Sequence, residues 1–148
     1  MPLPPQDRKL TTIEKVISLK SFDIFEQATV EQLARIAAVT QEVYFEPGQI
    51  IYEEGHPDDA LNFLLSGCVT LEKSGKPVFE IKERETFGTS TALNLQPHLF
   101  SAKASSLVHV LKLNARDFHD LLVLDGGLAL AVLRVLCHRF REGSFAMK

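Results

Sequence analysis

From Tyr44 to Val69 the chain reads YFEPGQIIYEEGHPDDALNFLLSGCV, an alternation of short apolar runs and turns. Each turn contains a glycine: Gly48, Gly55 or Gly67. Glycine adopts positive φ at little steric cost and lets two strands approach closely, so we expect these three residues at the corners of a sheet. The apolar runs between them are long enough for one short strand each. This stretch therefore predicts several short strands joined by tight turns.

The same pattern continues on both sides of this stretch. Apolar runs bounded by Gly, Pro, Ser or Asn recur from Gln41 to Leu113. Many short strands at such spacing are typical of an antiparallel barrel or sandwich, so we predict a mainly β fold. The strands are expected at 43–45, 50–52, 61–65, 69–71, 78–81 and 107–113.

Two short amphipathic helices are expected before the strands. Thr11 or Thr12 is placed to cap the first, and Thr29 with Gln32 forms a capping-box pattern for the second. Both helices need a surface on which to bury their apolar side chains. These are Ile13, Val16 and Ile17 in the first helix, and Val30, Leu33, Ile36 and Ala37 in the second.

Two further helices are expected after the strands. Asn114 is placed to cap the first of them, with Asp117 at the box position, and Gly126 and Gly127 interrupt the chain before a last helix over 128–141. The polar stripe of this last helix is narrow, so its apolar arc is too wide for a single contact. Two interpretations stay open: the helix packs on the β-structure on one side and on a partner on the other, or it is buried more deeply within its own domain.

Length and composition favour one domain that needs neither metal nor disulfide. The chain has 148 residues, of which 45% are hydrophobic and 24% are charged, as in ordinary globular proteins. Residues 1–10 are rich in proline and are expected to form an extended lead-in or linker, with a single domain over 11–148. Cys68 and Cys137 lie far apart in the chain, which favours reduced, buried thiols over a disulfide bridge or a zinc site.

Charge and hydropathy argue against nucleic acid and a membrane as partners of this chain. The net charge is −3, the acidic groups are concentrated before residue 103, and basic residues cluster only in the last helix. A duplex-binding surface needs clustered Lys and Arg, so no direct binding of nucleic acid is expected. The longest apolar stretch, Leu128 to Leu133, is far shorter than the ~20 residues of a membrane-spanning helix. A cytoplasmic protein, or a cytoplasmic piece of a longer one, is therefore expected.

The order of elements and the three turn glycines resemble the cyclic-nucleotide-binding domain family, over Phe22 to Arg141. This family includes sensor domains of catabolite-activator-type regulators, regulatory subunits of protein kinases and nucleotide-gated channels. The resemblance implies an antiparallel, jelly-roll-like β-roll (a double-stranded β-helix) with N-terminal helices and two C-terminal helices. It also implies that a ligand draws the binding cassette inward and that the C-terminal helices then re-pack, provided that the ligand binds one arrangement more tightly.

The resemblance extends to the phosphate-binding cassette of that family. Its usual form is Phe-Gly-Glu, a short helix, then Pro-Arg and small residues ending in Thr or Ser. Here the frame holds, but Thr89 replaces the Glu that binds the ribose hydroxyl and His98 replaces the Arg that binds the cyclic phosphate. By resemblance the candidate ligand-binding residues are Phe87, Gly88, Thr89, Ser90, Thr91, Pro97, His98, Leu99 and Ser101.

The two replacements weaken the expected binding of cyclic AMP or cyclic GMP. Thr89 is short and neutral, and His98 lacks the planar fork with which Arg holds a phosphate. Losing two charge-assisted contacts of about 2 kcal/mol each would weaken binding by roughly a thousandfold. Leu99 and Phe100 also stand where small residues are usual, so they would crowd or fill the pocket.

Two interpretations of the altered cassette stay open. In the first, 88–91 opens a short helix whose hydroxyls and free N–H groups, with His98, hold another small anion or nucleotide. In the second, Thr89 caps that turn and Phe100 closes the pocket, so that no ligand binds. No cofactor is certain; a cyclic nucleotide or another small anion is the candidate ligand.

No residue pattern points to catalysis. A metal enzyme on a comparable small roll would need a His-x-His pair with further ligands, whereas the five histidines of this chain are isolated from one another. His109, in the middle of an expected strand, is interpreted as a satisfied structural histidine. The acidic turn with Glu53 and Glu54 is interpreted as solvated surface.

We therefore expect a non-catalytic regulatory or signalling domain. The alternative is a ligand-free module of a larger protein that dimerises or docks. Its partner, a second copy or another part of the same protein, would bind helix 128–141.

Overall fold

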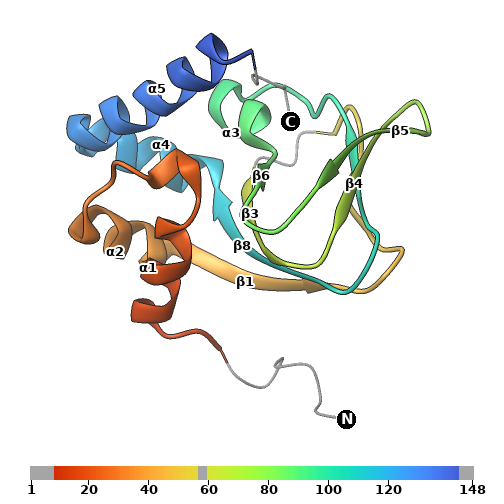
Figure 1. Cartoon of the computed structure of the whole chain (residues 1–148), viewed down its shortest axis with the longest axis horizontal. Coiled ribbons are helices and arrows are strands. Elements are labelled where there is room, and N and C mark those ends of the chain that lie inside the picture. The colour runs from red at the N-terminus through yellow and green to blue at the C-terminus, as the bar shows by residue number, and fades with distance from the viewer. Residues whose placement is uncertain (1–8, 57–59, 144–148) are drawn as a thin grey trace.

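The computed structural model describes residues 9–56 and 60–143, in which helices cover one end of a β-roll (Figure 1). The roll consists of two four-stranded antiparallel sheets, with strand orders β1-β8-β3-β6 and β2-β7-β4-β5. The predicted mainly β fold, with helices before and after the strands in the sequence, is confirmed. The elements are α1 (Thr12–Lys20), η2 (Asp23–Phe25), α2 (Val30–Val39), β1 (Thr40–Phe45), β2 (Ile50–Tyr52), β3 (Ala60–Ser66), β4 (Val69–Lys73), β5 (Lys76–Ile81), β6 (Thr86–Phe87), α3 (Thr89–Asn94), β7 (Ser101–Ala104), β8 (Val108–Asn114), α4 (Ala115–Leu124) and α5 (Gly126–Arg141).

Three elements were not predicted: the one-turn 3₁₀ helix η2 and the strands β6 and β7. Strand β6 is only two residues long, and β7 has the sequence SAKA, which has neither β-branched nor aromatic residues. Local propensity therefore does not favour β7, and β6 is too short to give a recognisable strand pattern although Thr and Phe are common in strands. Both form because neighbouring strands offer them hydrogen bonds: β6 pairs with β3, and β7 lies between β2 and β4.

The three turn glycines all adopt positive φ, as predicted. The angles are +86° at Gly48, +82° at Gly55 and +96° at Gly67. Gly67 has a second requirement, because a Cβ atom built there would lie 2.3 Å from the carbonyl oxygen of Leu107. At this corner the turn between β3 and β4 approaches the start of β8 more closely than any side chain allows.

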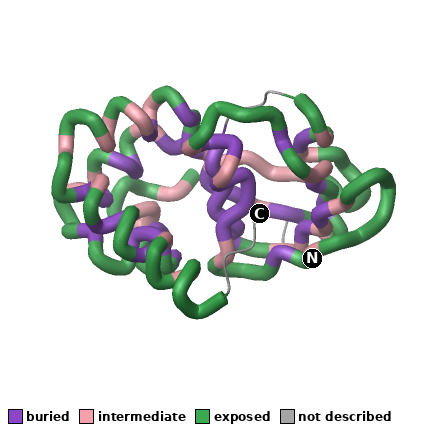
Figure 2. The backbone as a smooth tube through the Cα atoms, turned by 90° about the horizontal axis from the view of Figure 1, so that it is seen from above, coloured by how far each residue is buried: buried purple, intermediate pink, exposed green. Residues whose placement is uncertain are grey.

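The buried residues form two hydrophobic cores. Figure 2 shows buried residues in the middle of the molecule and on both sides of it. The helix-side core joins the helices to one face of β3 and β8, and Phe63 of β3 is stacked on Phe25 with ring centroids 5.3 Å apart. The roll-interior core lies between the two sheets and includes Leu64, the neighbour of Phe63. Because successive residues of a strand point to opposite faces, β3 contributes to both cores.

Helix α2 begins at its predicted cap, and of the two caps predicted for α1 the structure has Thr11. Thr11 caps α1 in a capping box with Glu14, and Thr29 caps α2 in a capping box with Gln32. The predicted apolar faces were partly wrong, because some of the apolar residues assigned to them are exposed to solvent. In α2 the residues Leu33, Ile36 and Ala37 are buried, whereas Val30 is exposed; in α1 Ile13 and Ile17 are exposed.

The predicted start of the last helix was wrong. Helix α5 begins at Gly126 rather than at Leu128, because the carboxylate of Asp125 caps it by accepting a hydrogen bond from the Leu128 N–H at 3.0 Å. A favourable cap offsets the low helix propensity of two successive glycines. Asn114 does cap α4, but through the N–H of Arg116 and without the expected box with Asp117.

Polar contacts fasten both ends of α5 to the N-terminal helices. Near its start, Asp125 accepts hydrogen bonds from Gln32 and forms an ion pair with Arg35 at 3.1 Å. Near its end, the guanidinium group of Arg139 binds both carboxylate oxygens of Asp23, with Nε donating to Oδ2 at 2.9 Å. The position of α5 is thus set by α2 and η2.

Within the described part of the chain, no single helix is long and apolar enough to cross a membrane. Only α4 and α5 taken together meet that test, and they are bent by 114° at their junction.

Replacing Gly67 by Ala should destabilise the fold by about 3 kcal/mol or more, because the new Cβ atom combines positive φ with a backbone clash. Gly48→Ala is the matched control: its φ is +86°, but a Cβ atom meets nothing within 4 Å. The control should lose only about 1–2 kcal/mol. Urea unfolding measures both values, and equal losses would contradict the close approach at Gly67.

Asp125→Asn should lower the thermal midpoint at neutral pH but not in strong acid. The Leu128 N–H first, then Gln32 and Arg35, lower the pKa of Asp125 below its usual value. A lowered pKa adds stability above the unfolded-state pKa, and this stability is lost as the pH falls through the folded-state value. The difference between wild type and variant should therefore disappear in strong acid. Exposed Asp120→Asn on α4 is the control, and an unchanged difference across the pH range would refute the ionic role of Asp125.

Candidate functional site

The cassette runs from β6 through α3 to β7, and Gly88 shapes its first corner. Gly88 has a φ of +81°, and a Cβ atom at this position would lie 2.6 Å from the carbonyl oxygen of Ala60. Only glycine fits here without moving β3. Phe87, immediately before it, is fully buried in the roll-interior core near Tyr52. Phe87 and Gly88, which match the family's cassette, are therefore required by the fold itself, whether or not a ligand binds.

Thr89 does not cap α3, which corrects one of the two interpretations of the cassette. Gly88 occupies the cap position in the left-handed conformation, and no side chain caps the helix. Thr89 lies inside the helix and is only 8% exposed, with its hydroxyl 3.3 Å from that of Thr86. Its hydroxyl donates to another buried hydroxyl and does not accept from the N–H groups of the helix.

His98 is buried and makes specific contacts with two neighbouring elements. It is 4% exposed, and its ring stacks on Tyr52 of β2 with centroids 3.6 Å apart and planes 7° apart. Its Nδ1 atom lies 3.0 Å from the hydroxyl oxygen of Thr91 on α3. The imidazole thus bridges the cassette helix and the roll.

The backbone of His98 is also fastened to the turn after β2. Its carbonyl oxygen accepts a hydrogen bond from the Gly55 N–H at 2.8 Å, and its N–H donates to the His56 carbonyl at 3.1 Å. Both the side chain and the main chain of His98 therefore hold the end of the cassette against β2 and its turn.

Phe100 lies against the roll-interior core. Its ring meets Phe79 of β5 edge-on, with centroids 5.5 Å apart. Leu99, by contrast, is exposed, and its carbonyl oxygen accepts a hydrogen bond from Lys73 at 3.1 Å. Of the two bulky residues beside His98, Phe100 is partly buried against the roll-interior core and Leu99 lies at the surface.

The structure brings only some of the predicted site residues together. Thr91 and His98 are in contact, and Ser90 beside them is half-buried. Pro97 is exposed, and the hydroxyl of Ser101 accepts a hydrogen bond from the Glu54 N–H at 2.9 Å. The ligand-binding role of the nine candidate residues stays a prediction.

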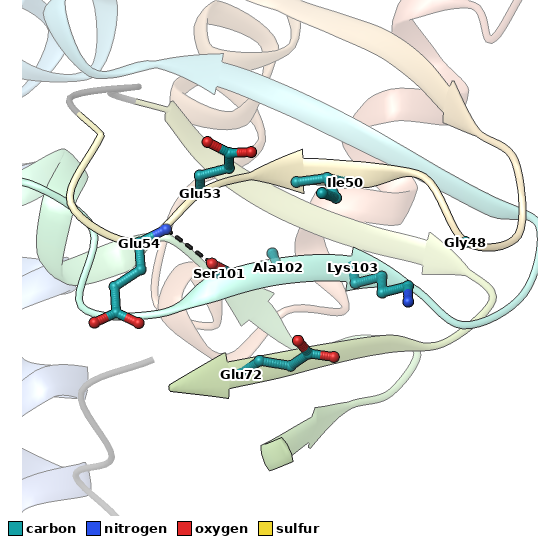
Figure 3. A pocket seen from close by; sticks show the side chains of 8 residues that line it. All are labelled: Gly48, Ile50, Glu53, Glu54, Glu72, Ser101, Ala102 and Lys103. Carbon is teal, nitrogen blue, oxygen red and sulfur yellow. Dashed lines mark hydrogen bonds between the residues drawn. The ribbon is translucent and has the colours of Figure 1, made fainter. Parts of the chain in front are cut away.

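A pocket of about 370 Å³ lies beside the cassette, on strands β2, β7 and β4 (Figure 3). Ser101 is the cassette residue in its wall, and the charged groups there are three glutamates and one lysine. The lining residues are Gly48, Ile50, Glu53, Glu54, Glu72, Ser101, Ala102 and Lys103. This mainly acidic lining does not suit a phosphate.

Glu54, interpreted from the sequence as solvated surface, has an ordered role instead. Its carboxylate accepts a hydrogen bond from the Ser74 N–H and pairs with Lys73 at 3.2 Å. These two contacts, the Ser74 N–H first, lower the pKa of Glu54. Only the spatial approach of the β4–β5 turn reveals this role, since the sequence shows no more than an acidic loop.

Two further titratable residues, His109 and Tyr44, have structural contacts with each other and with Glu42. His109 stacks on Tyr44 and binds the Glu42 carboxylate at 2.9 Å, so the prediction of a satisfied structural histidine is confirmed. Burial, and then Glu42, raises the pKa of Tyr44. Among residues 9–56 and 60–143, no three His, Cys, Asp or Glu side chains lie close enough to hold a metal ion.

The two cysteines are free thiols, as expected, but the prediction that both are buried was wrong. Cys68 is half-buried, and burial followed by Glu80 raises its pKa to about 11. Cys137 is exposed because it lies on the outer side of α5.

A hydrogen bond connects the cassette to the C-terminal helices. His119 of α4 lies 2.9 Å, through Nε2, from the carbonyl oxygen of Ala92 on α3. Ala92 is itself part of the helix-side core, which also holds Leu128 and Val132 of α5. A displacement of α3 would therefore act on α4 and the core beneath α5.

Comparison with known proteins agrees with this architecture of a sensor-type β-roll. Residues 42–125 match the sequence profile of the family described as Cyclic nucleotide-binding domain, and the chain belongs to this family. It is 32% identical to a cAMP-dependent protein kinase regulatory subunit of Emericella nidulans, over 74% of this chain and 26% of that protein. The chain spans only 13 to 26% of the length of the curated relatives that it matches.

Solved structures show the same fold. A protein of Geobacter metallireducens GS-15, described as cyclic nucleotide-binding, is 27% identical with a TM-score of 0.73, covering 81% of this chain and 90% of that one. The N-terminal domain of a transcriptional regulator from Streptomyces coelicolor A3(2) is 25% identical with a TM-score of 0.76, covering 88% and 97%. The chain is thus a β-roll domain of the kind found in regulatory and sensor proteins.

Thr91→Val should destabilise the domain by about 1–3 kcal/mol, because it leaves Nδ1 of buried His98 without the Thr91 hydroxyl while keeping the side-chain shape. Thr89→Val is the control, since its hydroxyl makes only the longer contact to Thr86. Urea unfolding measures the two losses. A smaller loss for Thr91→Val than for Thr89→Val would contradict a structural role for the Thr91–His98 contact.

Proposed function

We propose that this chain is a non-catalytic regulatory domain whose cassette is closed by its own side chains, so that cyclic AMP and cyclic GMP do not control it. The observation that carries the proposal is the environment of His98. This residue stands where the family's cassette has the phosphate-binding Arg, yet it is buried against Tyr52 and bonded to Thr91.

The energetics support a closed cassette. Turning His98 toward a cyclic phosphate would break both the stack on Tyr52 and the hydrogen bond to Thr91. An imidazole ring also lacks the planar fork with which Arg makes a bidentate, charge-assisted contact to phosphate. Thr89 provides no replacement for the missing Glu, because its hydroxyl lies against Thr86.

Phe100 supports the same conclusion from inside the roll. Its partly buried ring packs on Phe79 and against the roll-interior core, immediately before β7 begins. Where the family has a small residue, this chain has an aromatic ring against the core. A sensor for another small anion has less support, because the hydroxyls of Thr89 and Thr91 are both engaged within the protein.

A second candidate function, docking or dimerisation through α5, is favoured by one observation. Leu130, Leu133 and Phe140 of this helix are exposed, which favours the interpretation in which one side of its wide apolar arc packs on the domain and the other side on a partner. We infer that the regulatory output passes through this helix. We also infer a cytoplasmic setting, in which both thiols stay reduced.

Titration calorimetry with cyclic AMP and cyclic GMP tests the proposal. Wild type should show no binding in the low-micromolar range, since the two replaced contacts predict a loss of roughly a thousandfold. Low-micromolar binding by wild type would overturn the proposal.

A variant that restores the family's cassette makes the test sharper. Thr89→Glu with His98→Arg, Leu99→Ala and Phe100→Ala should bind at least about tenfold more tightly than wild type, because it regains both charged contacts and the space beside them. Thr89→Glu with only Leu99→Ala and Phe100→Ala is the control without the phosphate contact. Equal affinity of these two variants would contradict the role assigned to position 98.

A further inference from the structure

The pocket beside the cassette lies on the outer face of the roll. Its middle strand is β7, in which Ser101 and Lys103 alternate with Ala102 and Ala104 of the roll-interior core. Because successive residues of a strand point to opposite faces, Ser101 and Lys103 point away from that core. In the described part of the chain the helices pack on β3 and β8 of the other sheet, and they leave this outer face uncovered (Figure 1).

Two β-bulges flank the pocket. The pairing of β2 with β7 shifts between Ile50 and Tyr52, and the pairing of β4 with β5 shifts between Leu71 and Glu72. A bulge bends its strand and redirects the side chains beside it, so Ile50 and Glu72 stand where the sheet is bent. The resulting hollow of about 370 Å³ has the volume of a small-molecule site.

The wall of the pocket carries both signs of charge in a fixed order along β7. Lys103 lies opposite Ile50 at one end, and Ser101 lies opposite Glu72. Glu53 follows at the other end, beyond Ser101 (Figure 3). The side chain of Ile50, 54% exposed, is an apolar surface between the two ends.

Three of these charged groups are available to a ligand. The carboxylate of Glu54 is already bonded to the β4–β5 turn. The carboxylate of Glu53, in contrast, lies 3.3 Å from the exposed ring of His56 at the surface. Within the described part of the chain, the side chains of Glu72 and Lys103 form no hydrogen bond or ion pair. The pocket therefore offers two carboxylates and one ammonium group.

We propose that this pocket binds an amino acid with a cationic side chain, such as arginine. Its α-carboxylate binds Lys103 and its α-ammonium group binds Glu72. Its aliphatic stem lies on Ile50, and its guanidinium group binds Glu53. Two cationic groups and one carboxylate of the ligand thus meet two carboxylates and one ammonium group of the protein, in charge-assisted contacts.

The spacing of the strands fits a ligand of this length. Ser101 and Lys103 are two residues apart on one face of β7, so they are separated by about 7 Å along the strand. An extended arginine has a comparable length from its carboxylate to its guanidinium group. A phosphate would meet the two carboxylates, and a polyamine would bring a cationic group against Lys103, so both fit the lining less well.

This site goes beyond the proposed function, because it is separated from the roll interior by β7 itself. It also has a route to the cassette. The turn after β2, which carries Glu53, bonds through Gly55 and His56 to the backbone of His98. A ligand that fixes Glu53 therefore acts on the turn that holds the end of the cassette.

Amide chemical shifts of the full chain, labelled with nitrogen-15, test the proposal in a titration with L-arginine to about 10 mM at constant ionic strength. Arginine should shift the amides of residues 48–54 and 101–103 and saturate with a Kd of about 1 mM or lower. L-Citrulline, of the same shape but with a neutral side chain, and agmatine, which lacks the carboxylate, are the matched probes. Each should bind at least about tenfold more weakly than arginine.

Substitutions in the pocket assign the contacts. Glu72→Gln should weaken arginine binding by about tenfold. Lys103→Glu should reverse the preference, so that agmatine binds more tightly than arginine. Glu83→Gln makes the same change of charge as Glu72→Gln at an exposed position between β5 and β6, and this control should bind arginine like wild type. Circular dichroism checks that each variant folds.

Three results would overturn the inference: no saturable shift with arginine, equal affinities for arginine and citrulline, or shifts centred on α3 instead of β2 and β7. None of them bears on the binding of cyclic AMP or cyclic GMP, because calorimetry with those nucleotides measures that property separately. Conversely, low-micromolar nucleotide binding would refute the closed cassette and leave the arginine site on the outer face untouched.

Discussion

The packing of Phe63 determines how the helices sit on the roll. This side chain of β3 meets Phe22 edge-on at 5.1 Å and stacks on Phe25 at 5.3 Å, and Phe25 in turn meets Phe118 of α4 at 6.4 Å. These rings join the N-terminal helical segment, the central sheet and the first C-terminal helix. Since aromatic rings bury large areas and prefer particular mutual orientations, a shift of any one element would disturb the others.

The cassette and the C-terminal helices contact each other through this same core. Helix α3 contributes Ala92 to the same core, and His119 binds its carbonyl oxygen. In this protein the far end of the cassette is fastened as well, through His98 on Tyr52. The cassette is thus held at both ends, by His119 of α4 at Ala92 and by Tyr52 of β2 at His98.

Local signals predicted well wherever the physical cause is local. The caps at Thr11 and Thr29 were right because the donors and acceptors of a capping box lie within four residues of each other. The turn glycines were right because positive φ is a property of single residues. The start of α5 was wrong by two residues, since glycines 126 and 127 read as a break while the Asp125 cap outweighs their low propensity. Thr89 was also wrong as a cap, because the left-handed corner at Gly88 places it one position inside the helix.

The amino-acid sequence by itself determined the family, the turns, most of the strands and the two departures from the cassette, at positions 89 and 98. It showed that the family's Glu and Arg are absent, but not what the replacements do. Only the tertiary structure decided that His98 faces Tyr52 and Thr91, that Phe100 packs into the roll, and which apolar residues of α5 stay exposed. The physical reason is the same in each case: these contacts join segments distant in the chain, so the packing of the whole core selects them and no local pattern records them.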